Sequence, residues 1–208
     1  MKRIVNTNET KTPTDILIEI INIQKQKEEK INIWENSVFK DIASLEANNV
    51  GNVGEMYTQK ICEICKINSD INGLKTKQIC GGLDGDGTIK NKTVEIKTAR
   101  LGASASSFQH ELGEHPWNAD YMIFVDISPK IVFITIFKNF TEKQYKEKGF
   151  KCEPFFPTKT ITRRKGEGNF KLDTTLVINK KNIATGYTLI ITDQKWDIIS
   201  SFINKNIV

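Results

Sequence analysis

Residues 84 to 97 read Asp-Gly-Asp-Gly-Thr-Ile-Lys-Asn-Lys-Thr-Val-Glu-Ile-Lys, a pattern typical of a β-hairpin. Two glycines flank an acidic start, Asn91-Lys92 is the expected turn, and the second half alternates apolar with charged residues. With Asn91-Lys92 as a two-residue loop, Asp86 is expected opposite Lys97, and Thr88 opposite Glu95. The stretch therefore predicts two paired strands at the centre of the fold.

Side chains alternate along a strand, so Asp86, Glu95 and Lys97 are expected on one face of this hairpin. Val94, Ile96 and Thr98 would then face a core. Two carboxylates and an ammonium held on stiff strands can bind a hard divalent cation and activate a water. The alternative is that these charges form only a solvated face. An EF-hand is excluded, because Ile89 stands where the sharp turn of that loop needs glycine.

Composition is that of an ordinary soluble protein of one domain, with 208 residues, 38% of them hydrophobic and 26% charged. No apolar run reaches the roughly 20 residues of a membrane span, and the start lacks the apolar core of a signal peptide. We therefore expect a cytoplasmic location and no membrane partner. We divide residues 1–208 into a helical N-terminal part (1–50), a core (51–137) and a closing part (138–208).

The charge of the chain is uneven. The net charge is +5, and residues 138–181 alone carry 12 Lys and Arg against 5 Asp and Glu. A basic region beside an acidic, metal-type site suggests a polyanionic substrate, although a solvated lysine-rich surface would give the same count. Cys62 and Cys65 form a CxxC inside a helical pattern. Without a second pair of ligands, they are interpreted as two small buried residues rather than a zinc site.

Three helices are expected before the hairpin. The first begins at Thr12-Pro13 and continues at helical spacing through Ile31 and Trp34. A short one spans 37–47, with Val38, Ile42 and Leu45 facing inward. The third opens at residues 52–55, with Met56, Ile61, Ile64 and Cys65 as its apolar positions. Glu55 in its first turn either complements the helix dipole or points a further carboxylate at the hairpin.

After the hairpin, residues 103–112 are expected to form a short helix that carries Ser107, Gln109 and His110, side chains able to contact phosphates or bases. Both histidines, His110 and His115, are interpreted as polar or structural residues. Strands are expected at 121–127, 131–137, 175–178 and 187–192, and a closing helix at 196–203. The cluster Arg163-Arg164-Lys165, followed by Gly166 and Gly168, is expected in a loop or hairpin tip.

A helix with Glu55, a strand with Asp86 and a strand with Glu95-Ile96-Lys97 together resemble the PD-(D/E)xK nuclease superfamily, most closely in layout a type II restriction endonuclease. The resemblance covers roughly residues 50 to 137. One departure is that no proline precedes the acid, and Asp84 shares the parity of Asp86 and could take its place.

The resemblance implies an α/β (α+β) fold with a central mixed sheet flanked by helices, followed by a variable basic C-terminal region. It also implies Mg²⁺-dependent hydrolysis of double-stranded DNA, with Mn²⁺ as a possible substitute. Asp86, Glu95 and the backbone carbonyl of Ile96 would hold the metal, Lys97 would orient or deprotonate the attacking water, and Glu55 would be an auxiliary acid. The residues expected to contact DNA are Ser107, Gln109, His110, Arg163, Arg164, Lys165 and Lys171.

Such an enzyme would act as a homodimer in a restriction-modification system, with a cognate DNA methyltransferase as a genetic rather than a physical partner. Two other interpretations stay open. One is a structure-specific or repair nuclease with the same catalytic core. The other is a DNA-binding module without catalysis, in which the acidic cluster is only a solvated face.

Overall fold

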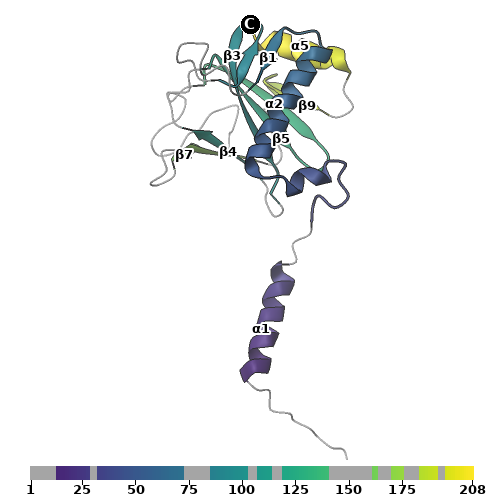
Figure 1. The fold of residues 1–208 in the computed structure, drawn as a ribbon, viewed down its shortest axis with the longest axis vertical. Coiled ribbons are helices and arrows are strands. Elements are labelled where there is room, and N and C mark those ends of the chain that lie inside the picture. The colour runs from purple at the N-terminus through teal and green to yellow at the C-terminus, as the bar shows by residue number, and fades with distance from the viewer. Residues whose placement is uncertain are drawn as a thin grey trace, which may run out of the picture. The chain divides into compact units, whose positions relative to one another are not determined.

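The computed structural model describes residues 13–28, 32–72, 85–102, 107–113, 119–140, 161–163, 170–175, 183–191 and 195–208. Contacts separate two units, Met1–Asn32 and Ile33–Val208. The first contains the predicted helix, α1 (Pro13–Glu28) (Figure 1). Its predicted continuation to Trp34 is wrong. Trp34 belongs to the second unit, where it is buried and its indole N–H donates to the carbonyl of Leu101 at 3.1 Å.

The second unit is built on a six-stranded mixed sheet, which confirms the predicted sheet class. Its strand order is β1 (Ser69–Ile71), β2 (Gly87–Ile89), β3 (Lys92–Arg100), β5 (Tyr121–Ile127), β6 (Val132–Lys138) and β9 (Thr188–Ile191). Strands β3 and β5 pair in parallel, and the other neighbours are antiparallel. Every residue of β5 is buried, as expected of a strand covered on both faces.

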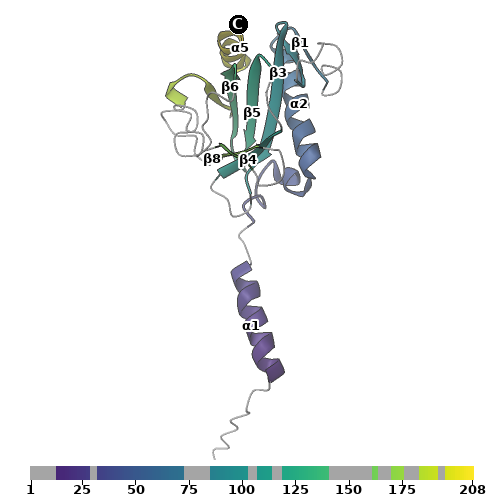
Figure 2. The same ribbon diagram turned by 90° about the vertical axis from the view of Figure 1, so that its left-hand side faces the viewer.

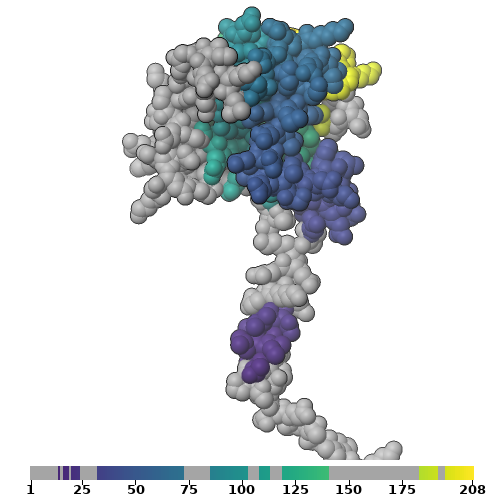
Figure 3. All heavy atoms as spheres, viewed as in Figure 1, coloured from purple at the N-terminus to yellow at the C-terminus, as the bar shows by residue number. Residues whose placement is uncertain are grey.

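Helices α2 (Ala47–Ile64) and α5 (Trp196–Asn206) flank this sheet, and a short 3₁₀ helix, η1 (Lys40–Ser44), precedes α2. In Figures 1 and 2, α2 runs along the sheet beside β3, and in Figure 3 it forms much of the surface facing the viewer. The side chains between α2, α5 and the sheet form an aliphatic core that includes Ile61, Ile89, Ile123, Ile136 and Ile203.

Two helix predictions need correction. In place of the helix predicted at 37–47, only η1 forms before α2 begins at Ala47; Ile42 is buried in η1, while the preceding Val38 is exposed. Helix α2 starts at Ala47 rather than at residue 52, and its buried residues are Val50, Gly54, Thr58, Ile61 and Cys62. Of the apolar positions predicted for this helix, Met56 and Ile64 are exposed. The helix packs through a glycine and a threonine, which an apolar periodicity does not detect.

A second sheet has the order β4 (Ser107–Gly113), β8 (Phe170–Thr175) and β7 (Ile161–Arg163), all antiparallel. The helix predicted at 103–112 is therefore wrong. Phe108, His110 and Leu112 are buried while Gln109 and Glu111 are exposed, the period of two that marks a strand. The buried side of β4 packs on the main sheet, where the ring centroids of Phe108 and Phe133 lie 6.3 Å apart.

The closing elements agree with the sequence, since β9 and α5 fall within or around their predicted ranges. Strand β8 reaches Thr175, the first residue of the predicted range 175–178, and residues 176–178 lie outside the described residues. Among the described helices, none is long and apolar enough to cross a membrane.

Candidate active site

The predicted hairpin is present as β2 and β3, but its turn lies one residue earlier than predicted. Lys90 and Asn91 both have positive φ, 53° and 63°, as a two-residue type I′ turn requires. Thr88 consequently pairs with Thr93 and not with Glu95. The correction moves each partner by two positions along β3, so it leaves every side chain on its predicted face.

Tertiary contacts explain why the turn uses Lys90. Its ammonium donates to the carbonyl of Ile207 at 2.8 Å, and its backbone N–H donates to the carbonyl of Asn68 at the same distance. Both partners are far away in sequence. A propensity argument that favours asparagine at the first turn position cannot include them.

Asp86 lies directly before β2 begins, beside the part of β3 that extends past β2. Its backbone N–H donates to the carbonyl of Val94, and its carboxylate Oδ2 accepts a hydrogen bond from the N–H of Ile96, both at 2.7 Å. The Asp86 carboxylate thus accepts a hydrogen bond from β3 at a position where β2 has no paired residue. Because the N–H and C=O of one strand residue point to the same edge, the carbonyl of Ile96 lies on the edge that Asp86 occupies.

Glu95 and Lys97 meet beside this edge. The Lys97 ammonium lies 2.6 Å from Glu95 Oε1, and their side chains are only 22% and 16% exposed, respectively. Val94 and Ile96, the alternate residues of the same strand, are buried in the core. The predicted division of β3 into a charged face and a core face is therefore confirmed.

Glu55 reaches the same group of charges from α2. Burial raises the pKa of the Glu55 carboxyl, the Glu95 carboxylate raises it further, and Lys97 lowers it. Because α2 starts at Ala47 and has no acid in its first turn, the helix-dipole explanation of Glu55 is wrong. Its neighbour Gly54 is packed so closely on β3 that an added Cβ would lie 1.8 Å from Thr98 Oγ1.

The electrostatics of the cluster are dominated by unneutralised acid. The pKa of Asp86 is raised to about 7: burial is the largest cause, the Glu95 and Glu55 carboxylates add to it, and the Ile96 N–H and Lys97 oppose it. Among the described residues, these three carboxylates have one ammonium nearby, that of Lys97, so a bound cation would relieve their repulsion. The structure brings together all four residues that the sequence assigned to catalysis.

The donor set suits Mg²⁺ in type, since it offers carboxylate and carbonyl oxygens. The proposed ligands are two carboxylates, Asp86 and Glu95, and the backbone carbonyl of Ile96. Within the described ranges, no group of three or more His, Cys, Asp or Glu side chains could hold a metal ion as placed. The set needs a backbone oxygen as its third protein ligand. Asp84 lies outside the described residues.

Those of the predicted DNA-contacting residues that the structure describes lie on the second sheet. Ser107 and Gln109 lie on β4, where Gln109 is exposed. Lys171 lies in β8 and pairs with Glu111, and Arg163 ends β7 in the last pair of the β7–β8 hairpin, with Phe170. Arg164 and Lys165 lie outside the described residues.

His110 differs from the rest of that set, because its imidazole is buried. Nε2 lies 2.7 Å from Asp126 Oδ1, and both side chains are 0% exposed. Among the residues that the structure describes, His110 Nδ1 and Asp126 Oδ2 have no hydrogen-bond partner. The structure supports the structural interpretation of His110 and leaves no exposed imidazole surface for a nucleic acid.

Sequence reasoning missed the Asp126 partner and the Gly54–Thr98 packing. The alternation of Phe108, His110 and Leu112 was the available signal for a strand that would bury the histidine. Nothing local marks Gly54 or Thr98, because their contact joins a helix to a strand about 40 residues further along the chain.

Comparison with known proteins adds no relative to this picture. No protein-family model, no curated protein and no solved structure matches the chain.

Proposed function

We propose that this protein is a Mg²⁺-dependent endonuclease that hydrolyses phosphodiester bonds of double-stranded DNA, with the sequence specificity of a type II restriction enzyme. The observation that carries the proposal is the convergence of Glu55, Asp86, Glu95 and Lys97 at the edge of β3. A solvated face would not require a carboxylate fixed by a backbone N–H, nor an ion pair that is mostly buried.

Each residue has a role that its position supports. Asp86 is held by the Ile96 N–H, so its carboxylate presents oxygen at a fixed place on the edge, and Glu95 adds a second carboxylate. A bound Mg²⁺ would polarise the scissile phosphate and lower the pKa of the attacking water. Lys97, next to Glu95, would orient that water, help to remove its proton, and offset charge that develops on the phosphate. Glu55 would act as an auxiliary acid.

The proposal includes a restriction-endonuclease-like core. It is supported by the mixed sheet, the β2–β3 hairpin that carries the acids, and a helix that brings Glu55 to them. The basic residues of 138–181 follow this core in the sequence and would contact the DNA backbone and bases.

The experiment is incubation of purified protein with phage DNA and Mg²⁺, followed by sequencing of the fragment ends. We expect discrete ends, and no cutting when the metal is chelated. Asp86→Ala, Glu95→Ala and Lys97→Ala should each lower the cleavage rate by orders of magnitude. The two carboxylate changes should also weaken metal binding, and Lys97→Ala should weaken it much less. Lys92→Ala, on the same strand, is the matched control and should cut normally.

Other outcomes favour the alternatives. Preferential cutting of four-way junctions over plain duplex would indicate a structure-specific or repair nuclease with the same catalytic residues. Binding without cutting, with any divalent metal, would reduce the protein to a DNA-binding module. If Asp84→Ala lost activity while Asp86→Ala kept it, the metal ligand would be Asp84 and the assignment to Asp86 would be wrong.

A further inference from the structure

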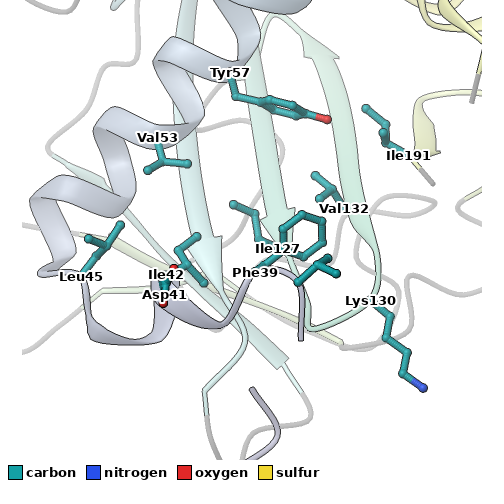
Figure 4. Close-up of a pocket in the computed structure, with 11 residues that line it drawn as sticks. Phe39, Asp41, Ile42, Leu45, Val53, Tyr57, Ile127, Lys130, Val132 and Ile191 are labelled. Atoms are coloured by element: carbon teal, nitrogen blue, oxygen red, sulfur yellow. The ribbon is translucent and has the colours of Figure 1, made fainter. Parts of the chain in front are cut away.

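An apolar groove lies on the second unit, on the other flank of α2 from Glu55. Its volume is about 660 Å³, and Figure 4 shows Val53 and Tyr57 of α2 beside it, with residues of η1, β5, β6 and β9 around it. Residues 53 and 57 lie one turn apart on α2, and residue 55 points to the opposite side of the helix. An occupant of the groove would therefore leave the acidic site open.

An apolar ridge formed by Val38 and Phe39 borders this groove. Val38 is 88% exposed and Phe39 is 37% exposed, although both line the groove. Two hydrogen bonds of the Ser37 hydroxyl hold the ridge in place. The hydroxyl donates to the carbonyl of Pro129 at 2.7 Å and accepts from the N–H of Phe39 at 2.9 Å. Because the ridge is already ordered, inserting it into a partner costs little conformational entropy.

Opposite charges lie on either side of the ridge. Figure 4 shows Asp41 and Lys130 separated on the two sides of Phe39, with Lys130 extended away from the apolar side chains. Both are exposed, and neither forms a salt bridge with any described residue. One patch thus holds a ridge, a groove, an acid and a base.

We propose that this patch is a two-fold interface between two copies of the chain. A two-fold interface uses the same surface on both subunits, so it must be self-complementary. Here the Val38-Phe39 ridge of each copy enters the groove of the other. Asp41 of each copy then faces Lys130 of its partner. The inference rests partly on the proposed function, since cutting both strands of a duplex requires two active sites.

The interface is tested by the mass of the full chain in sedimentation velocity, from micromolar to millimolar concentration, without DNA or metal. We expect a dimer. Val38→Asp should weaken dimerisation by roughly 30-fold or more, as expected for a buried apolar anchor. The matched control is Met56→Asp, which changes an apolar residue that is also exposed (70%) and that does not line the groove. This control should stay dimeric.

Charge reversal tests the two-fold geometry. Asp41→Lys alone and Lys130→Asp alone should each weaken the dimer by about tenfold, because each places like charges together across the axis. The double variant should restore the dimer, since the pairs are then reversed but complementary. Thermal melts of all variants serve to check that each one folds.

Three results overturn the proposal. A wild-type chain that stays monomeric assigns the groove to another occupant. A Val38→Asp chain that stays dimeric places the interface elsewhere, for example on α1, which exposes several large aliphatic side chains. A double charge variant that is no better than the singles rules out the two-fold pairing. A monomeric active nuclease would refute only the interface, and an inactive dimer only the proposed function.

Discussion

Asp86 is the residue on which the candidate site depends, and its protonation should govern stability as well as metal binding. Its pKa is about 7 in the folded chain and near 3.8 in the unfolded chain. At a pH well below 3.8 the carboxyl is protonated in both the folded and the unfolded chain, so it does not change the free energy of unfolding. As pH rises from about 4 to about 7 the unfolded chain ionises first, so folding loses free energy through that window. Each unit of the difference is equivalent to about 1.4 kcal/mol.

We therefore predict that Asp86→Asn, which keeps an acceptor for the Ile96 N–H, melts higher than the wild type at pH 8. The advantage should shrink as the pH falls toward 4. Thermal melts across this range measure it, and an advantage that is constant with pH would contradict the electrostatic origin. Mg²⁺ should raise the melting temperature of the wild type at pH 8 and have little effect on Asp86→Asn, because the cation needs the ionised carboxylate.

Glu55 provides a second prediction at this scale. It lies in the middle of α2, so it has no helix-end role to lose, and its carboxyl interacts with Glu95 and Lys97. Glu55→Gln keeps the shape and removes the charge. We expect cleavage to fall by at least tenfold while the melting temperature stays the same or rises slightly, because a raised pKa means that the ionised form is unfavourable in the fold.

The control for Glu55 is Glu63→Gln on the same helix, where Glu63 is exposed and pairs with Lys60 at 2.6 Å. That change should leave both the melting temperature and the cleavage rate close to those of the wild type, because an exposed ion pair contributes little. Equal effects of the two variants on cleavage would remove Glu55 from the site. Rates and melts on one preparation of each variant separate these outcomes.

At the scale of elements, the contact between α2 and β3 sets where Glu55 stands. Gly54 lies directly against Thr98, so an added Cβ would collide with its side chain. Gly54→Ala should destabilise the protein by about 1–3 kcal/mol and lower activity, since α2 must move away from β3. Thr98→Ala in the same chain should recover part of both losses. Urea unfolding and cleavage rates measure the two effects.

Gly51 is the matched control for this prediction. It lies one turn earlier in the same helix, and an added Cβ there meets nothing within 4 Å. Gly51→Ala should stabilise the protein by up to about 1 kcal/mol, because alanine is the better helix former. If both glycine variants behaved alike, helix propensity rather than close packing would decide the cost.

Elements also show how far the sequence alone could reach. The hairpin was predictable because alternation over Val94-Glu95-Ile96-Lys97 is local and long enough to assign faces. Its turn was not, because Lys90 is held by Ile207 and Asn68, which are remote in the chain. The strand β4 was predictable in principle from Phe108, His110 and Leu112. Small polar residues nearby favoured a helix start and obscured that alternation.

The candidate site was predicted better than the elements that carry it, and the reason is physical. Asp86, Glu95 and Lys97 were placed on one face by the alternation of side chains along a strand. A one-residue error in the turn shifts each partner by two residues and so does not change that face. The position of Glu55 depends on Gly54, and the partner of His110 depends on a sheet-to-sheet contact. Neither contact leaves a periodic signal, because each joins segments that are distant in sequence.

At the scale of the whole molecule, charge divides the chain into an acidic site and a basic region. Residues 138–181 hold an excess of seven positive charges, while the rest of the chain has a small negative excess. An acidic site repels a polyanion on its own, so the proposed nuclease would need another part of the same protein to attract DNA. Within this region the structure describes residues 138–140 and the paired strands β7 and β8, where Arg163 forms the last pair of β7.

The final prediction concerns the cluster Arg163-Arg164-Lys165 in that region. Arg163→Ala or Arg164→Ala should weaken binding to every duplex and reduce the salt slope by about 1 if the side chain contacts a phosphate. If it reads guanine instead, the loss should be roughly 1–3 kcal/mol of discrimination at one base position. Binding at several salt concentrations, on cut-site and scrambled duplexes, distinguishes the two roles.

Lys60→Ala is the control for charge alone, because it removes one cation from α2, where Lys60 is exposed and pairs with Glu63. Its salt slope should match that of the wild type. If the triple alanine variant of the cluster also kept wild-type affinity and specificity, these cations would be only a solvated surface. The attraction of DNA would then depend on other basic residues of 138–181. A loss in the triple variant that Lys60→Ala does not share would assign that attraction to the cluster, because both changes remove surface cations and only one removes them from the basic region.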